Sequence, residues 1–337
     1  MLNQRWYRVF YALCPLWAEG FSFYVGGVCF LICEPMDIAQ QFPIRRKPQQ
    51  KAAFRQAVGE YARNLGYSVT VEENKKGCYN VVIGEAANAK YLVTAHYDTP
   101  ATSPLPNFYT PNNLFLYFAY QMLLVLVYMA VAGLVCLPAW LLTHDSFVTF
   151  LIWYAAYMLL VFSVRFGPAN KNNWNDNTSG VVTLLETART MPENQRHKVC
   201  FILFDQEEKG LVGSKAYRKA HMLQTEQQII LNLDCVGDGD EIRLFPTKKL
   251  KADETAMSWL SRICGKSGRK NIDLKVKGPS FYPSDQKNFP NAVAIAAFGK
   301  KKLVGLYHGR IHTNRDTVLD RTNVNILRAA LTTLICQ

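Results

Sequence analysis

Residues 199–208 read VCFILFDQEE, six apolar residues followed directly by a polar and mostly acidic segment. Six residues is the length of a short strand, and the β-branched and aromatic content favours a buried one. Three further runs have the same character: Tyr91–His96 (YLVTAH), Ile229–Val236 (IILNLDCV) and Ala292–Phe298 (AVAIAAF). We therefore expect the core to be built around these four strands.

Helical patterns alternate with the predicted strands. Residues 48–66 carry apolar side chains at helical spacing and end at Gly66, a typical helix stop. The other predicted helices are Val181–Ala188, Ser214–Leu223, Glu254–Ile263 and Val324–Ile335. Alternation of strands and helices predicts an α/β fold, a three-layer α/β/α sandwich with a mostly parallel central sheet. Ligands in such folds bind beyond the carboxyl ends of the strands.

A long apolar insertion interrupts this pattern. No Asp, Glu, Lys or Arg occurs from Thr99 to Thr143. Within this stretch, Leu114–Leu142 exceeds the roughly 20 residues that a helix needs to cross a bilayer, and a second uncharged run, Phe147–Val164, follows closely. A linker this short joins antiparallel helices, which predicts an inserted transmembrane helical hairpin over 111–166. The alternative is a helical hairpin buried inside a large core.

The segments that flank the hairpin, 36–110 and 167–337, together have the length of one α/β domain. A hairpin returns the chain to the side that it left, so both segments share one compartment. The role of residues 1–35 is open. The apolar run Val9–Cys33 is compatible with a signal anchor, a third membrane helix or a re-entrant segment, and Met36 is an alternative start.

Charge and cysteine content bear on the compartment. Lys and Arg number 38 against 26 for Asp and Glu, a net charge of +12. This excess suits an anionic membrane face, and it lacks the aromatic-interleaved motif of a nucleic-acid interface. Nine scattered cysteines without a CxxC pair indicate buried thiols in a reducing compartment. We expect a multi-pass protein of the cell membrane that contacts the lipid bilayer, with its soluble domain in the cytoplasm and no nucleic-acid partner; the oligomeric state is left open.

Histidines and carboxylates recur where the predicted strands end. In chain order they are His96, Asp98, Asp176, Glu207, Glu208, Asp234 and His312. Each motif alone is weak, because paired glutamates usually form a solvated face and a single Asp often caps a turn. Five motifs in order at successive strand exits are much more specific. Such a set has the number and type of ligands to hold two divalent ions such as zinc.

These blocks resemble those of a known enzyme family. They are HYDT (96–99), NDNTSG (175–180), DQEEKGLVGS (205–214), NLDCVG (232–237) and HTNRDT (312–317). They are similar to the signature blocks of the co-catalytic zinc aminopeptidases, a family that includes bacterial leucyl aminopeptidases, aminopeptidase Y, glutamate carboxypeptidase II and glutaminyl cyclase. The resemblance covers about residues 50–100 and 170–337 and implies that the soluble domain has the zinc-peptidase fold. Two residues depart from the family pattern: Trp174 replaces a small residue and Gln206 replaces Gly.

The resemblance also implies roles. Two Zn²⁺ ions would be bound, with Asp176 as the bridging ligand, His96 and Asp234 completing one site, and Glu208 and His312 completing the other. Asp98 would accept a hydrogen bond from the ring of His96 and fix its tautomer. Glu207 would be the general base that activates the metal-bridging water. Asp316 is expected to orient local backbone and not to bind metal.

The function predicted in this way is that of a membrane-anchored di-zinc metallopeptidase, an aminopeptidase that hydrolyses N-terminal residues of peptide substrates. The alternatives are a glutaminyl cyclase-like acyltransferase and a catalytically inactive receptor or scaffold relative. The side-chain preference, and the choice between aminopeptidase, dipeptidase and carboxypeptidase, stay open. The hairpin holds the site near the bilayer, which favours apolar peptides as substrates; alternatively, it is only an anchor.

Overall fold

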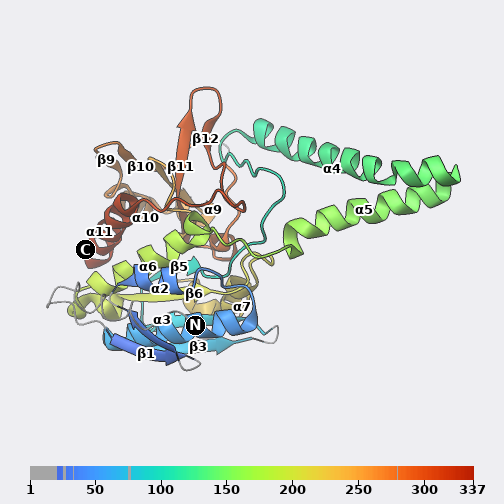
Figure 1. Cartoon of the computed structure of the whole chain (residues 1–337). Helices are drawn as coiled ribbons and strands as arrows, with labels where there is room; N and C mark the ends of the chain where they lie inside the picture. Colours follow the sequence, from blue (N-terminus) through green and yellow to red (C-terminus); the bar gives the residue numbers. More distant parts are fainter. Residues whose placement is uncertain (1–20, 26–27, 33, 75–76, 279) are drawn as a thin grey trace.

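A ten-stranded sheet lies at the centre of the computed structural model, which describes residues 21–25, 28–32, 34–74, 77–278 and 280–337 (Figure 1). The strand order is β3-β4-β6-β5-β7-β11-β8-β10-β9, and β12 pairs with β11. The strands are β3 (Val69–Glu73), β4 (Tyr79–Ile83), β5 (Tyr91–His96), β6 (Val199–Phe204), β7 (Ile229–Leu233), β8 (Glu241–Pro246), β9 (Gly265–Ser267), β10 (Lys270–Leu274), β11 (Ala292–Lys301) and β12 (Gly305–Tyr307).

The sheet is mixed. Its middle strands β6, β5, β7 and β11 are mutually parallel, and β8 is parallel to β10. The remaining pairs are antiparallel: β3–β4, β4–β6, β11–β8, β10–β9 and β11–β12. The expectation of a mostly parallel sheet is thus right for the middle and wrong for the whole. Short connections such as that between β11 and β12 can only join antiparallel strands, whereas a parallel pair needs a long crossover.

Helices pack on both faces of the sheet. Phe201 and Leu203 of β6 point into one apolar cluster with residues of α3, α6, α10 and α11, while Ile202 and Phe204 point into another with Tyr217 of α7. This alternation follows from the two-residue period of a strand. The helices of the domain are α2 (Pro35–Gln41), α3 (Pro48–Asn64), η1 (Trp174–Ser179), α6 (Gly180–Thr190), η2 (Glu193–Lys198), α7 (Val212–Ala220), α8 (Met222–Thr225), α9 (Lys248–Lys251), α10 (Glu254–Ser261), η3 (Asp285–Asn288) and α11 (Arg321–Cys336).

Two long apolar helices, α4 (Leu114–Thr143) and α5 (Ser146–Phe166), project together from the domain as a hairpin (Figure 1). Their bounds lie close to the predicted ones. Only Ala132 and Cys136 are buried in α4, and no residue is buried in α5. The alternative of a hairpin inside the core is therefore wrong. Both helices are long and apolar enough to cross a membrane.

The described part of the N-terminal apolar run forms strands. β1 (Phe21–Val25) and β2 (Val28–Ile32) pair antiparallel in a two-stranded sheet of their own. The interpretation of the whole run Val9–Cys33 as a third membrane helix is thus wrong for residues 21–25 and 28–32, which form strands. The predictions for residues 1–20 lie outside the described residues.

Candidate metal centre

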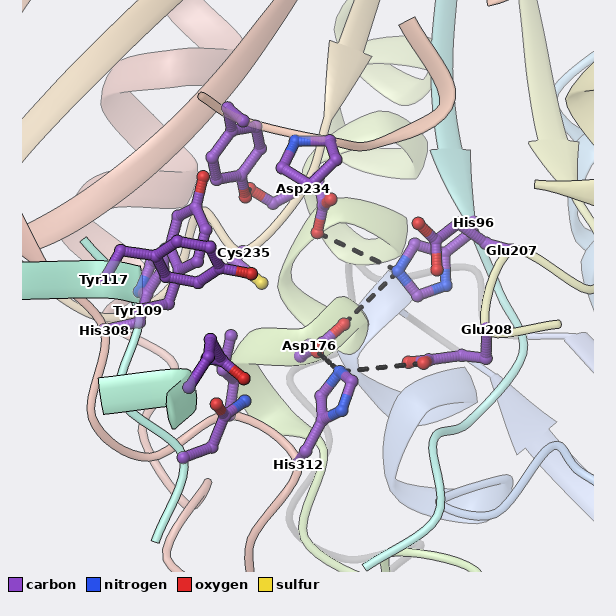
Figure 2. Close-up of a pocket in the computed structure, with 15 residues that line it drawn as sticks. His96, Tyr109, Tyr117, Asp176, Glu207, Glu208, Asp234, Cys235, His308 and His312 are labelled. Atoms are coloured by element: carbon purple, nitrogen blue, oxygen red, sulfur yellow. Dashed lines mark hydrogen bonds and ion pairs between the residues drawn. The ribbon is translucent and has the colours of Figure 1, made fainter. Parts of the chain in front are cut away.

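The seven predicted site residues come from one edge of the sheet. His96 ends β5, and Asp98 lies two residues later. Glu207 and Glu208 follow β6, and Asp234 directly follows β7. Asp176 lies in η1, before α6, and His312 lies between β12 and α11. Because β5, β6 and β7 are neighbouring parallel strands, their carboxyl ends bring these side chains together, and Figure 2 shows all of them except Asp98.

Asp176 lies between two groups of possible ligands. Its Oδ1 is 3.3 Å from Nε2 of His96, which is 3.8 Å from Oδ1 of Asp234. Its Oδ2 is 2.9 Å from Nε2 of His312, which is 3.6 Å from Oε2 of Glu208. In each group the ligand atoms lie within 4.8 Å of one another. One carboxylate therefore presents a different oxygen to each group.

The residues present fit a bound zinc ion. Imidazole nitrogens and carboxylate oxygens are ordinary zinc ligands. The Oε1 atom of Glu208 is buried and has no hydrogen-bond partner in the described part of the chain, and such an orphaned acceptor suits a cation. Burial, together with the negative charge of Asp176 and against the nearby ring of His312, raises the pKa of Glu208 to about 8. Carboxylates packed this closely need positive charge nearby.

The histidines show the same electrostatics. Burial lowers the pKa of His312, but the charges of Glu208 and Asp176 outweigh it and raise the pKa to about 10. Burial likewise opposes the neighbouring carboxylates at His96, and its pKa is again raised well above the usual value. The high density of negative charge at the site favours a proton on each ring, and for the same reason it would favour a metal cation.

A network of backbone contacts orients Asp176. The two carboxylate oxygens of Asp316 accept hydrogen bonds from the amides of Asn175 and Asp176, at 2.9 and 3.0 Å. Asn177 donates from its side chain to the carbonyl of Leu233 at the end of β7 and accepts from the amide of Gly180. Asp316 thus contacts the backbone of the central residue, as expected, and belongs to neither group of possible ligands.

Asp98 supports the segment after β6. Its Oδ1 accepts from the amide of Glu207 at 2.9 Å, and its Oδ2 accepts from that of Glu208 at 3.3 Å. Its separation from Nδ1 of His96 is 3.5 Å, which is long for a hydrogen bond. Burial would raise the pKa of Asp98, but the nearby ring of His96 lowers it. The carboxylate therefore holds the backbone of the two glutamates, whereas Nδ1 of His96 has no hydrogen-bond partner among the described residues.

Glu207 faces the same cavity as the possible ligands. Burial raises its pKa well above the usual value, and Glu208 and Asp285 add to the effect against the charge of His96. A carboxylate with a raised pKa is suited to accept a proton near neutral pH. The preceding residue, Gln206, has a φ of 56°, a left-handed conformation that favours glycine. A glycine, which the resemblance described above leads one to expect here, would adopt this conformation without strain.

The cavity has a volume of about 280 Å³. Residues that the sequence did not point to also line it: Asn107, Tyr109, Tyr117, Gln121, Cys235, Tyr282, Pro283, His308 and Ile311. Burial raises the pKa of the Cys235 thiol, which keeps it protonated, and lowers the pKa of His308 to about 4. Tyr282 donates to the carbonyl of Asp234 at 3.0 Å. Figure 2 shows the rings of Tyr109, Tyr117 and His308 opposite His96 across the cavity.

Arg45 is a further supporting residue that the sequence did not reveal. It is buried and donates to the carbonyl of Tyr97, between His96 and Asp98, at 2.6 Å. Its Nη2 donates to the side chains of both Asn173 and Thr178, on either side of Asp176. Burial lowers the pKa of Arg45 to about 10. One guanidinium therefore links two of the segments that carry the site.

Comparisons with known proteins agree with this geometry. Residues 163–334, just over half of the chain, match the model of peptidase family M28. No curated protein is significantly similar to the chain. Among solved structures, a glutaminyl cyclase from Porphyromonas gingivalis is 13% identical, with a TM-score of 0.57 over 90% of this chain and 96% of that one.

Two other solved structures have the same fold. A Zn-dependent exopeptidase from Parabacteroides distasonis is 15% identical, with a TM-score of 0.57 over 88% of this chain and 94% of that one. The LapA aminopeptidase of Legionella pneumophila is 15% identical, with a TM-score of 0.53 over 90% and 68%. At these identities the structures establish the fold. The family match runs from the last residues of α5 into α11, a segment that carries Asp176, Glu208, Asp234 and His312. The chain belongs to peptidase family M28.

Proposed function

We propose that this M28 chain is a membrane-anchored di-zinc aminopeptidase. The observation that carries the proposal is the position of Asp176, which turns one carboxylate oxygen toward His96 and the other toward His312. A shared carboxylate between two groups of ligands is the arrangement expected of a two-metal site. His96, Asp176 and Asp234 would hold one ion, and Asp176, Glu208 and His312 would hold the other.

Zinc bound there would polarise the scissile carbonyl and make a water molecule more acidic. The protein's own part is proton transfer and orientation. Glu207 accepts the proton of the attacking water and returns it to the leaving amine. Asp98 accepts a hydrogen bond from the backbone amide of Glu207 and so holds the segment from which this carboxylate projects.

The catalytic domain in this proposal comprises residues 36–110 and 167–337, and residues 111–166 anchor it. Large apolar side chains on the hairpin support the anchor, because Phe115 and Leu142 are each 85% exposed, an unfavourable arrangement in water. Arg165 lies at the domain end of α5, whereas the turn between the helices carries Asp145. By the positive-inside rule, this asymmetry favours a cytoplasmic domain.

The function is tested by assaying detergent-purified full-length protein on a panel of aminoacyl-amides, with and without added zinc. We expect zinc-dependent release of the amino acid. Glu207→Gln should lower kcat by about 10²–10⁴-fold while bound zinc stays unchanged. Glu254→Gln, an exposed glutamate in α10, is the matched control and should behave as wild type.

The outcomes separate the candidate functions. If a peptide with an N-terminal Gln yields a pyroglutamyl product and no free glutamine, the reaction is cyclisation and not hydrolysis. Absence of bound zinc together with absence of turnover would leave the inactive scaffold. For the anchor, a reporter active only in the cytoplasm, inserted between His144 and Asp145, should be silent; a signal there would refute the proposed orientation.

A further inference from the structure

The first turns of α4 form part of the cavity wall. Tyr117 and Gln121, one helical turn apart in α4, line the same cavity as His96, Asp176 and Asp234. Figure 2 shows Tyr117 on the side of the cavity opposite His96. A helix long and apolar enough to cross a membrane therefore contributes, at its first turns, to the wall of the candidate metal centre.

Hydrogen bonds at the N-terminal end of α4 hold its first turns against the domain. The side chain of Asn113 caps the helix by accepting from the amide of Leu116 at 3.1 Å. The backbone amide of Asn113 in turn donates to the buried hydroxyl of Thr110 at 3.3 Å. The hydroxyl of Tyr120 donates to the carbonyl of Pro106. The first turns are thus bonded to the loop that follows the β5 strand.

Aromatic contacts complete the attachment. The ring of Tyr117 lies 5.4 Å from that of Tyr109 and 5.9 Å from that of Phe281, and Tyr109 lies 5.8 Å from Tyr282. These separations are in the range of favourable aromatic pairs. Tyr109 is also paired through its backbone with His308, so the wall continues into the segment that leads to His312.

The cavity is chemically two-sided. The carboxylates and the imidazoles of His96 and His312 form one side, whereas Tyr109, Tyr117 and His308 lie opposite His96 (Figure 2). The ring of Tyr282 packs on that of Tyr109, and Pro283 and Ile311 add apolar surface to the lining. Asn107 and Gln121 add amides. A peptide whose scissile bond lies at the metal side would place its first side chain among the rings.

The length of α4 agrees with a role outside the bilayer. Thirty residues make a helix of about 45 Å, about 15 Å more than the hydrocarbon core. The 21 residues of α5 match that core. Since the helices join at the turn of His144 and Asp145, the surplus lies at the end that carries Tyr117 and Gln121.

We propose that Tyr117 and Gln121 of α4 are specificity-determining residues, and that the wall they form selects peptides with a large apolar or aromatic N-terminal side chain. This inference rests on the proposed aminopeptidase function. The hairpin is then part of the substrate site as well as an anchor, and selectivity depends on how α4 is seated on the domain.

The test uses full-length protein in detergent and compares kcat/KM for phenylalanyl-amide and alanyl-amide. Tyr117→Ala should lower the phenylalanyl-to-alanyl ratio by about tenfold, and Tyr117→Phe should retain it because the ring forms the wall. Gln121→Ala should also change the ratio. Phe115→Ala and Met122→Ala are matched controls on exposed positions of α4, 85% and 60% accessible, and should keep the wild-type ratio.

A second readout does not need turnover. In zinc-loaded Glu207→Gln protein, binding of phenylalanine hydroxamate relative to alanine hydroxamate should weaken when Tyr117→Ala is added. Unchanged ratios in both Tyr117→Ala and Gln121→Ala, or an equal change in Phe115→Ala, would overturn the inference and leave the aminopeptidase standing. A wild-type protein that cleaves no aminoacyl-amide would instead overturn the proposed function, and the inference with it.

Discussion

Replacing Asp316 by Asn tests whether one carboxylate supports both groups of possible ligands. The two oxygens of Asp316 accept from the amides of Asn175 and Asp176 at 2.9 and 3.0 Å. Asn keeps one acceptor but turns an NH₂ group toward the other amide. One charge-assisted hydrogen bond is lost, worth about 1.5–3 kcal/mol, which corresponds to roughly a 10- to 150-fold change in an equilibrium constant.

The loss should fall on both zinc ions, because Asp176 belongs to both groups. Burial raises the pKa of Asp316 to about 7, so the measurement is made at pH 8, where the carboxylate is ionised. Zinc affinity is measured by competition with a chromophoric chelator, and metal content by elemental analysis. We expect Asp316→Asn to weaken both equivalents by about 10- to 150-fold.

Asp234→Asn is the comparison, since Asp234 belongs to one group only, and it should weaken one equivalent. Thermal midpoints of the metal-free proteins control for loss of the fold. If Asp316→Asn binds both equivalents with wild-type affinity, or loses only one, the reasoning about a shared support for Asp176 is refuted.

Three further predictions concern the surroundings of the site. Lys51→Met should lower the free energy of unfolding in urea by about 3–5 kcal/mol, because it leaves the buried Asp205, 2.5 Å from Lys51 Nζ, with backbone amides but no cation as partner; a loss below 1 kcal/mol would contradict this. Asp98→Asn should weaken zinc binding about 10- to 100-fold, as for other residues that orient ligands, and unchanged affinity by chelator competition would argue against that role. Burial alone would raise the pKa of Asp320, but the hydrogen bond from Lys270 lowers it to about 2. The contribution of the Asp320 carboxylate to stability is therefore complete above the unfolded pKa of 3.8 and is lost as the pH falls toward 2. The free energy of unfolding in urea of Asp320→Asn should thus differ from that of wild type at pH 6 and converge with it near pH 2. A difference that stays constant with pH would be the contrary result.

The buried strands were predictable because burial leaves a continuous apolar run. The predicted Tyr91–His96 and Val199–Phe204 coincide with β5 and β6. The outer strands were missed for the converse reason. β3 (Val69–Glu73) is not fully buried at any position, and β9 (Gly265–Ser267) is exposed throughout. Such segments become strands through their neighbours in the sheet and not through a pattern of their own.

The predicted site residues come together because parallel strands end at one edge, so an ordered series of strand exits predicts proximity. The opposite wall of the cavity was not predicted, because Tyr117 and Gln121 lie in a run that indicates a membrane helix. One signal was present in the sequence. Gln121 is the only amide side chain from Leu114 to Leu142, and a polar residue in such a segment is by default a candidate for function.

The place of the hairpin in the chain imposes an order on biosynthesis. β5 pairs with β6 and β7, and β4 pairs with β6; both partners, β6 and β7, are translated after α4 and α5. A nascent chain in which the hairpin has just been translated therefore holds β4 and β5 with no strand between them and with His96 unaccompanied by Asp176. The candidate metal centre can assemble only after α5 has been translated, so a chain cut short within α5 keeps His96 and Asp98 but lacks the other five site residues.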